Sequence, residues 1–218
     1  MPTDASHISP GRKWIMSVLV VLLLFTGCSA PDPPGAETAS GPPWPPSDTQ
    51  GQFQPMPESA ALNQDVQACG TTVQLRSVPG ALGEYKATVQ DDGTTRVDFR
   101  GTPKADITRV SDGAVLRGLP AGGEGSYELY SRDGKQVTYS SEGPHVYAAF
   151  DETEAKVFAS HGLPAVFTYE SGTLTERVVF GDREGNRVVS AEIEQNTVTG
   201  VQDICRLLDE AMGTKAAS

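Results

Sequence analysis

The sequence predicts a mainly antiparallel all-β domain, either a sandwich or a curved meander sheet, with one mid-chain helix and a C-terminal helix that a disulfide ties to the sheet. Three observations support this fold class. About ten short segments alternate between apolar and polar residues, Asp-Gly pairs recur between them, and only two segments carry a helical period. The 218 residues are 38% hydrophobic and 21% charged, which is enough apolar material for one core.

Alternation with a period of two residues identifies the strands. Tyr85, Ala87 and Val89, for example, alternate with polar residues, so one face of this segment is expected to be buried. The segments with this pattern are 71–76, 85–90, 95–100, 105–110, 126–131, 135–140, 145–150, 165–170, 174–180 and 187–195.

Tight turns are predicted where Asp or Asn stands beside Gly, because these residues tolerate positive φ. Asp92-Gly93, Asp112-Gly113 and Asp133-Gly134 follow one another at intervals of about twenty residues, and Gly185-Asn186 comes later. We expect each pair to form the turn of a hairpin, so that successive strands run antiparallel.

Two segments favour helix. Segment 151–160 begins with Asp151 as a candidate N-cap and has Glu154 three residues later, an arrangement typical of a capping box. Segment 201–212, with Thr199 as a candidate cap, places its apolar residues on one stripe that would face the sheet. That stripe consists of Val201, Ile204, Cys205, Leu208, Ala211 and Met212.

The N-terminus has the features of an export signal. Arg12 and Lys13 precede twelve uncharged residues, 14–25, which are too few to cross a bilayer as a helix, since crossing takes about 20. The following Phe25-Thr26-Gly27-Cys28 resembles the lipobox of bacterial lipoproteins, with Phe25 where that family usually has an aliphatic residue.

This resemblance covers residues 1–28 only. It implies cleavage before Cys28 and attachment of a diacylglyceryl group to the Cys28 thiol, with fatty acyl chains such as palmitate as the membrane anchor. Two or more acyl chains suffice for stable anchoring. The expected location is therefore the extracytoplasmic face of the cell membrane.

Composition divides the chain into four parts. We expect a signal peptide at 1–27, the lipidated Cys28 with a disordered Pro-rich tether at 28–62, one β-rich globular domain at 63–213 and a disordered tail at 214–218. Nine of the 16 prolines lie between residues 29 and 59, and such a segment buries too little apolar surface to fold by itself.

The cysteines fit an oxidising compartment. The lipid would occupy Cys28, which leaves Cys69 near the start of the domain and Cys205 near its end. We predict that these two form a disulfide.

Charge and motifs exclude several functions. A net charge of -11 and a pI near 4.7 argue against nucleic-acid binding. The sequence lacks HExxH, CxxC, GxSxG and GxxxxGK[ST], so we expect no enzymatic activity, no metal and no cofactor. The alternative is a hydrolase with a dispersed site around His145, which a distant Ser and Asp would have to complete.

The tyrosines give the most specific indication of a binding site. Four of the six, Tyr127, Tyr130, Tyr139 and Tyr147, lie within 21 residues on three candidate strands. Filling of the core accounts for such a group, but Tyr130 and Tyr147 could also line a shallow site for a glycan or a lipid ring system.

The favoured function is a non-enzymatic binding or interaction domain, expected to be monomeric, with a glycan, lipid or protein of the cell envelope as its partner. The alternative outside the enzyme class is a lipid or glycolipid carrier with an apolar cavity.

Overall fold

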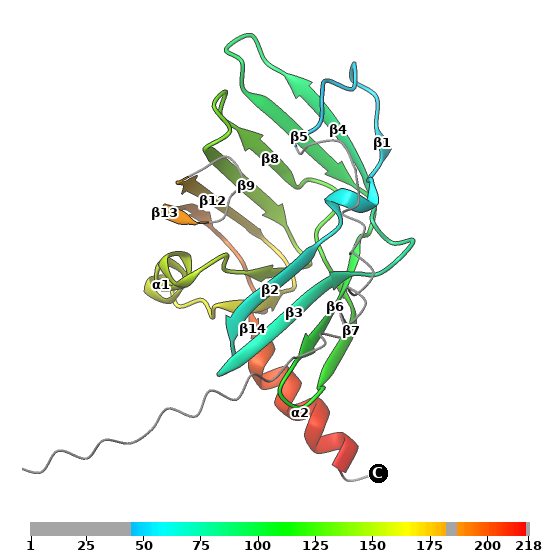
Figure 1. The fold of residues 1–218 in the computed structure, drawn as a ribbon, viewed down its shortest axis with the longest axis vertical. Coiled ribbons are helices and arrows are strands. Elements are labelled where there is room, and N and C mark those ends of the chain that lie inside the picture. The colour runs from blue at the N-terminus through cyan, green and yellow to red at the C-terminus, as the bar shows by residue number, and fades with distance from the viewer. Residues whose placement is uncertain (1–44, 182–186, 217–218) are drawn as a thin grey trace, which may run out of the picture. The chain divides into compact units, whose positions relative to one another are not determined.

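The computed structural model describes residues 45–181 and 187–216, which belong to one compact unit, Thr38–Ser218. Three antiparallel sheets and two α-helices make up this unit, which confirms the predicted fold class (Figure 1). The predicted signal peptide, Cys28 and residues 29–44 of the predicted tether lie outside the described residues. No helix in the described part of the chain is long and apolar enough to cross a membrane.

The largest sheet has seven strands, formed mainly by three hairpins laid side by side. Its order is β1 (Gln54–Pro55), β4 (Glu84–Val89), β5 (Thr95–Arg100), β8 (Tyr127–Tyr130), β9 (Gln136–Glu142), β12 (Thr173–Phe180) and β13 (Val188–Asn196).

Two smaller sheets complete the architecture. The four-stranded sheet contains β2 (Asn63–Ala68), β3 (Thr71–Ser77), β6 (Lys104–Arg109) and β7 (Val115–Pro120). The three-stranded sheet contains β10 (His145–Ala148), β11 (Val166–Tyr169) and β14 (Gln202–Asp203). The helical elements are a 3-10 turn η1 (Glu58–Ala60), α1 (Glu152–Ser160) and α2 (Ile204–Ala216).

Each of the ten predicted segments contains a strand, and the Asp-Gly turns lie where expected. Asp92-Gly93 joins β4 to β5, Asp112-Gly113 joins β6 to β7, and Asp133-Gly134 joins β8 to β9. Gly93, Gly113 and Gly134 all have positive φ, which is the conformation that makes glycine favourable there. The predicted turn at Gly185-Asn186 lies outside the described residues.

Four further strands, β1, β2, β7 and β14, were not predicted. β2 and β3 pair up to Ala68 and Thr71, so Cys69 and Gly70 form a two-residue turn with φ of 55° and 71°. A cysteine at positive φ is uncommon, and this hairpin therefore lacks the usual sequence signal. β7 contains Gly118 and ends at Pro120, two residues that weaken a strand pattern.

The predicted tether was too long at its C-terminal end. β1 pairs with β4, and the Thr49 hydroxyl donates a hydrogen bond to the carbonyl oxygen of Ala87 at 3.1 Å. The amide of Ala87 in turn donates to the Thr49 hydroxyl. Residues 45–62 are thus packed on the domain, because β4 would otherwise leave its outer backbone groups unpaired at that sheet edge.

Both predicted helices form. Asp151 is the N-cap of α1, and its side chain accepts hydrogen bonds from the amides of Thr153 and Glu154. The second helix begins later than predicted, at Ile204, and Thr199 is not its cap. Asp203 takes that role, since its Oδ1 accepts a hydrogen bond from the Cys205 amide at 2.7 Å. α2 continues to Ala216, into the predicted tail.

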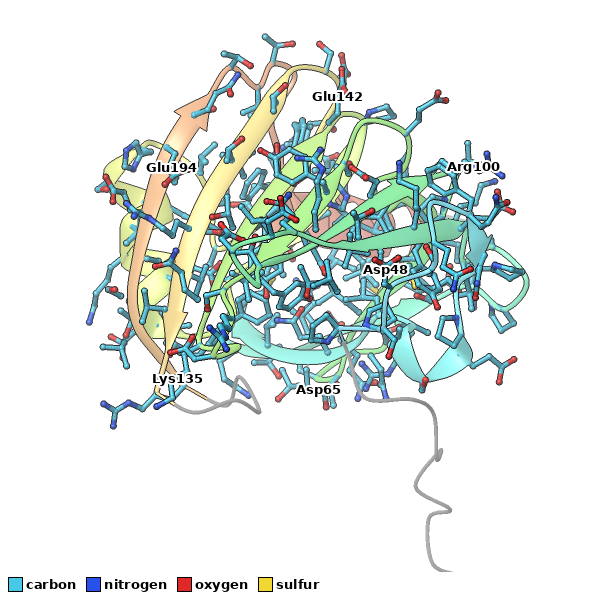
Figure 2. All side chains as sticks on the ribbon, turned by 90° about the horizontal axis from the view of Figure 1, so that it is seen from above. Asp48, Asp65, Arg100, Lys135, Glu142 and Glu194 are labelled. Atoms are coloured by element: carbon cyan, nitrogen blue, oxygen red, sulfur yellow. A yellow bond between two sulfur atoms is a disulfide. The ribbon has the colours of Figure 1, made fainter. Side chains whose placement is uncertain are left out.

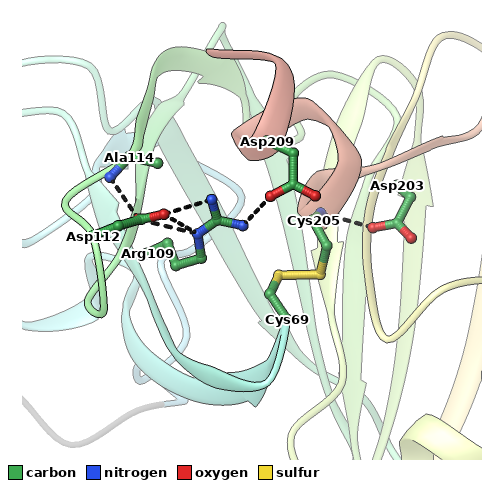
Figure 3. A network of polar contacts seen from close by, with 7 residues as sticks. All are labelled: Cys69, Arg109, Asp112, Ala114, Asp203, Cys205 and Asp209. Atoms are coloured by element: carbon green, nitrogen blue, oxygen red, sulfur yellow. Dashed lines mark hydrogen bonds and ion pairs between the residues drawn. A yellow bond between two sulfur atoms is a disulfide. The ribbon is translucent and has the colours of Figure 1, made fainter. Parts of the chain in front are cut away.

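A covalent bond and an ion-pair network tie α2 to the four-stranded sheet (Figure 3). The predicted disulfide between Cys69 and Cys205 is present, with a Cα–Cα distance of 5.2 Å. Arg109 of β6 contacts Asp112 at 2.7 Å and Asp209 of α2 at 2.5 Å. Hydrogen bonds from Arg109 and from the Ala114 amide lower the pKa of Asp112 below its usual value.

One face of the seven-stranded sheet is lined with apolar side chains, among them Val97, Val137 and Val178. A row of directly paired residues crosses this inner face from β5 to β13, in the order Val97, Glu128, Tyr139, Glu176 and Ile193. Two carboxyl groups thus flank a tyrosine on an otherwise apolar surface.

Candidate ligand-binding cleft

A cleft of about 270 Å³ lies between the inner face of the seven-stranded sheet and the elements that face it. Residues 56–62, with η1, and β3 form one wall, β5, β8 and β9 form another, and β10 with residues 121–123 completes it. Its apolar lining includes Met56, Ala60, Ala61, Leu62, Leu75, Leu82, Phe99, Val146, Ala148 and Phe150. Most of the contact surface that a ligand would meet is therefore hydrocarbon.

The charges at the cleft give it no free positive group. Of the described residues that line it, Arg100 is the one permanent cation, and its Nε lies 2.5 Å from Glu84. The Arg100 guanidinium also stacks over the Phe53 ring at 4.2 Å. Figure 2 shows Arg100 near the surface of the domain. Glu128 also lines the cleft and accepts a hydrogen bond from the Tyr130 hydroxyl at 2.5 Å.

His145, at the start of β10, lines the cleft. Its ring meets Tyr147 and Tyr169 edge to face, with centroid distances of 5.7 Å and 6.2 Å. The Nδ1 atom is buried and has no hydrogen-bond partner. Burial lowers the pKa of His145 from 6.5 to about 4, so the imidazole is neutral at physiological pH.

Gly122 leaves room for this ring. A Cβ at Gly122 would lie 3.2 Å from Cε1 of His145, so the wall of the cleft has no side chain at that point. Glycine is also favoured here by its φ of +94°.

Tyr147 lies between the cleft and the buried carboxyl group of Glu176. Its ring lines the cleft and packs against Phe158 and Phe167, with centroid distances of 5.6 Å and 5.9 Å. Its hydroxyl donates to Oε2 of Glu176 at 3.2 Å.

Glu154 and Glu176 form a fully buried carboxyl pair. Burial is the main reason why the pKa of each lies well above its usual value, and the charge of Glu176 raises that of Glu154 further. Oε2 of Glu154 accepts a hydrogen bond from the Phe150 amide. The Oε1 atom of each carboxyl is buried and has no hydrogen-bond partner among the other described residues. We conclude that the pair retains a proton at neutral pH, which one carboxyl donates to the other.

The two tyrosines singled out from the sequence have different environments. Tyr147 lines the cleft. Tyr130 is 8% exposed and packs in the core cluster with Val137 and Val178, so it does not belong to the lining. Tyr139, which packs against Phe150 with ring centroids 5.5 Å apart, and Tyr127 also line the cleft.

Sequence reasoning missed the buried carboxyls, although a signal was available. Leu174, Glu176 and Val178 occupy alternate positions of β12, so Glu176 shares the buried face with its apolar neighbours. The sequence pattern predicts Glu154 as a capping residue. Its side chain does bond to the backbone before α1, but to Phe150 instead of the N-cap Asp151.

The described residues show no cluster of three or more His, Cys, Asp or Glu side chains that could hold a metal ion. Comparison of the chain with protein-family models, with curated proteins and with solved structures gives no match. The geometry of the cleft is therefore the main guide to function.

Gly123 lines the cleft, and replacing it by Ala should strongly destabilise the folded protein. Its φ is +145°, and a Cβ there would lie 2.3 Å from the carbonyl oxygen of Gly101. We expect Gly123→Ala to lower the free energy of unfolding by about 3 kcal/mol. In the control Gly113→Ala, where φ is +71° and the added Cβ meets nothing within 4 Å, the loss should be about 1 kcal/mol. Urea denaturation measures both, and equal losses would contradict the clash.

Proposed function

We propose that this chain is a membrane-anchored extracytoplasmic lipoprotein whose β domain binds a small, mainly apolar ligand in the cleft without converting it chemically. The observation that carries the proposal is the cleft itself, lined by Met56, Phe99, Tyr139, Tyr147 and Phe150. Ligand sites in proteins are typically concave and apolar, with a few polar groups that fix the orientation of the ligand.

The size of the cleft favours a small ligand over a whole lipid. Pockets for drug-sized ligands have volumes of roughly 300–1,000 Å³. At about 270 Å³, this cleft lies just below that range and suits one or two rings or a short acyl segment. A binding module therefore accounts for the geometry better than a carrier that encloses complete acyl chains.

The environment of His145 does not favour the hydrolase alternative. A catalytic imidazole needs a nucleophile and an orienting group within hydrogen-bond reach. Nδ1 of His145 has no such partner among the described residues, and burial keeps the ring neutral far below pH 7.

The proposed location rests on the N-terminal sequence. The lipobox-like segment that ends at Cys28 supports lipid anchoring, and the acidic composition argues against electrostatic attachment to anionic lipids. The disulfide between Cys69 and Cys205 suits an oxidising compartment. A soluble glycan fragment or a lipid headgroup with a ring system would be a suitable ligand.

Blocking the cleft should abolish ligand binding. Ala61 lines the cleft directly after η1, so Ala61→Trp would fill it without disturbing a strand. The matched control is Ser59→Trp, in the same turn but exposed and outside the lining. As a small apolar probe with two rings we choose 2-naphthol, which we expect to bind the unmodified protein with a Kd below about 1 mM. Ala61→Trp should weaken this binding at least tenfold.

The methyl signals of methionine give a local readout. Met56 lines the cleft and Met212 lies on α2, so in full-length protein labelled at methionine methyl groups, 2-naphthol should shift the Met56 signal and leave the Met212 signal in place. Detergent does not bias this comparison, because both methyl groups are observed in one sample at the same concentration of free 2-naphthol. Failure of 2-naphthol to shift Met56, or equal binding by Ala61→Trp and Ser59→Trp, would contradict the proposed function.

A further inference from the structure

The buried polar atoms without partners gather around one side chain of the cleft. Three side-chain atoms of the described residues are buried with no hydrogen-bond partner: Nδ1 of His145, Oε1 of Glu154 and Oε1 of Glu176. The His145 ring contacts Tyr147, and the Tyr147 hydroxyl donates to Glu176. The two carboxyls can partner each other through a shared proton, but His145 has no comparable neighbour.

From this we infer that His145 is the polar anchor of the cleft and that the ligand is a neutral or cationic ring compound that donates a hydrogen bond, through a hydroxyl or amine, to Nδ1. This inference rests on the proposed function, since it specifies the chemistry of the ligand in the same cleft.

The imidazole is suited to accept a hydrogen bond. Its lowered pKa of about 4 leaves the ring neutral, so one nitrogen carries a hydrogen and the other is an acceptor. A buried N–H without an acceptor is rarer in proteins than a buried acceptor without a donor. The tautomer with hydrogen on Nε2 is thus favoured, and the unpartnered Nδ1 is the acceptor that a ligand donor would satisfy.

The ring surroundings fit a flat ligand. Tyr147, Tyr139 and Phe99 line the cleft, and the His145 ring occupies the space that a side chain at Gly122 would fill. Aromatic ligands pack well against such faces and edges.

The charges exclude an anionic ligand. Glu128 lines the cleft, and the carboxyl pair lies behind Tyr147. Arg100, the permanent cation of the lining, is already engaged by Glu84 and the Phe53 ring. An anion would therefore meet net negative potential without a free cation, whereas a neutral or cationic donor would not.

Three naphthalene probes test the inference in the full-length protein, with the Met56 methyl signal as the readout. 2-Naphthol donates a hydrogen bond, 2-methoxynaphthalene keeps the ring and oxygen but cannot donate, and 2-naphthoate is an anion. We expect His145→Phe to weaken 2-naphthol about three- to tenfold, the effect of one hydrogen bond, and to change 2-methoxynaphthalene less than twofold. The binding of each probe is compared between the unmodified protein and the variant at one detergent concentration, so the partition of the probe into detergent is the same in both measurements.

Two further comparisons make the test decisive. His145→Leu should behave like His145→Phe, so the result does not depend on one variant folding, and His161→Phe should leave all binding unchanged, because His161 is exposed and outside the lining. In the unmodified protein, 2-naphthoate should bind at least tenfold more weakly than 2-naphthol. Because the anion partitions least into neutral micelles, detergent cannot cause that weakness.

The possible outcomes distinguish a failure of this inference from a failure of the proposed function. A Met56 signal that none of the three probes shifts would overturn the proposed function and the inference together. Probes that bind equally well to the unmodified protein and to both His145 variants would overturn the inference alone, as would 2-naphthoate binding more tightly than 2-naphthol.

Discussion

Replacing Cys69 and Cys205 together by serine is expected to lower the free energy of unfolding by about 3–5 kcal/mol. The disulfide joins residues 136 positions apart, and in the chain-entropy treatment a loop of roughly 100 residues is worth about 4.7 kcal/mol. That figure is an upper value, since unfolded chains retain some structure. Urea denaturation of the double variant against the parent protein measures the loss.

The loss should concentrate at one end of the domain. Ile204 and Leu208 of α2 are fully buried, and Asp209 pairs with Arg109, so these contacts still hold the helix once the covalent bond is gone. We expect earlier hydrogen exchange in α2 and β3 than in β9 and β12 of the double variant. Reduction of the parent protein should reproduce the effect. A loss below about 1 kcal/mol would mean that these contacts alone fix α2.

Stability should fall as pH rises from 6.5 to 8.5, which is the direction opposite to ordinary acid denaturation. The pKa values of Glu154 and Glu176 are raised above 4.5 in the folded protein, so the folded state keeps a proton that the unfolded chain has already released in this range. Each retained proton gives a slope of about 1.4 kcal/mol per pH unit. We expect a fall of about 2–3 kcal/mol over the two units.

The pH range avoids the opposing contribution of His145. Its pKa is lowered in the folded state, so its contribution to stability is complete above about pH 6.5 and is lost as pH falls towards 4. The groups that face the carboxyl pair are Tyr147, Tyr139 and Asp151, together with Glu128 beside Tyr139. The pKa values of both tyrosines are raised, so neither ionises in this range.

Glu176→Gln isolates this effect. The amide keeps a carbonyl oxygen for the Tyr147 hydroxyl and removes one ionisable group, so the variant should be about 2 kcal/mol more stable than the parent at pH 8.5 and depend less on pH. The control Glu192→Gln, on the exposed side of β13, should follow the parent curve. Parent stability that is constant or rises from pH 6.5 to 8.5 would contradict the shared proton.

Local sequence signals predicted most of the strands because their causes are local. Alternation at Tyr85, Ala87 and Val89 and the turn at Asp92-Gly93 depend on neighbours within one hairpin. The signal failed at Cys69-Gly70, where a cysteine adopts positive φ, and that turn joins β2 to β3. The disulfide partner of Cys69 could still be predicted, because the lipid expected on Cys28 leaves Cys205 as the other cysteine for pairing.

The candidate site was far less predictable. Its walls come from three sheets and η1, so Met56, Phe99 and His145 meet only through tertiary packing. The sequence did indicate Tyr147, but grouped it with Tyr130, which packs in the core. His145 was noticed as a candidate catalytic base. Its buried and unpartnered Nδ1, to which we assign the ligand contact, depends on neighbours such as Gly122 that sequence spacing does not reveal.

Native mass spectrometry of the protein released from its own membrane tests the central claim most directly. We predict a mass that includes an acylated N-terminal Cys28 and a second population carrying one additional neutral or cationic small molecule, which disappears in Ala61→Trp and persists in Ser59→Trp. A protein that begins at Met1 without acylation, or a bound molecule that Ala61→Trp retains, would contradict the account.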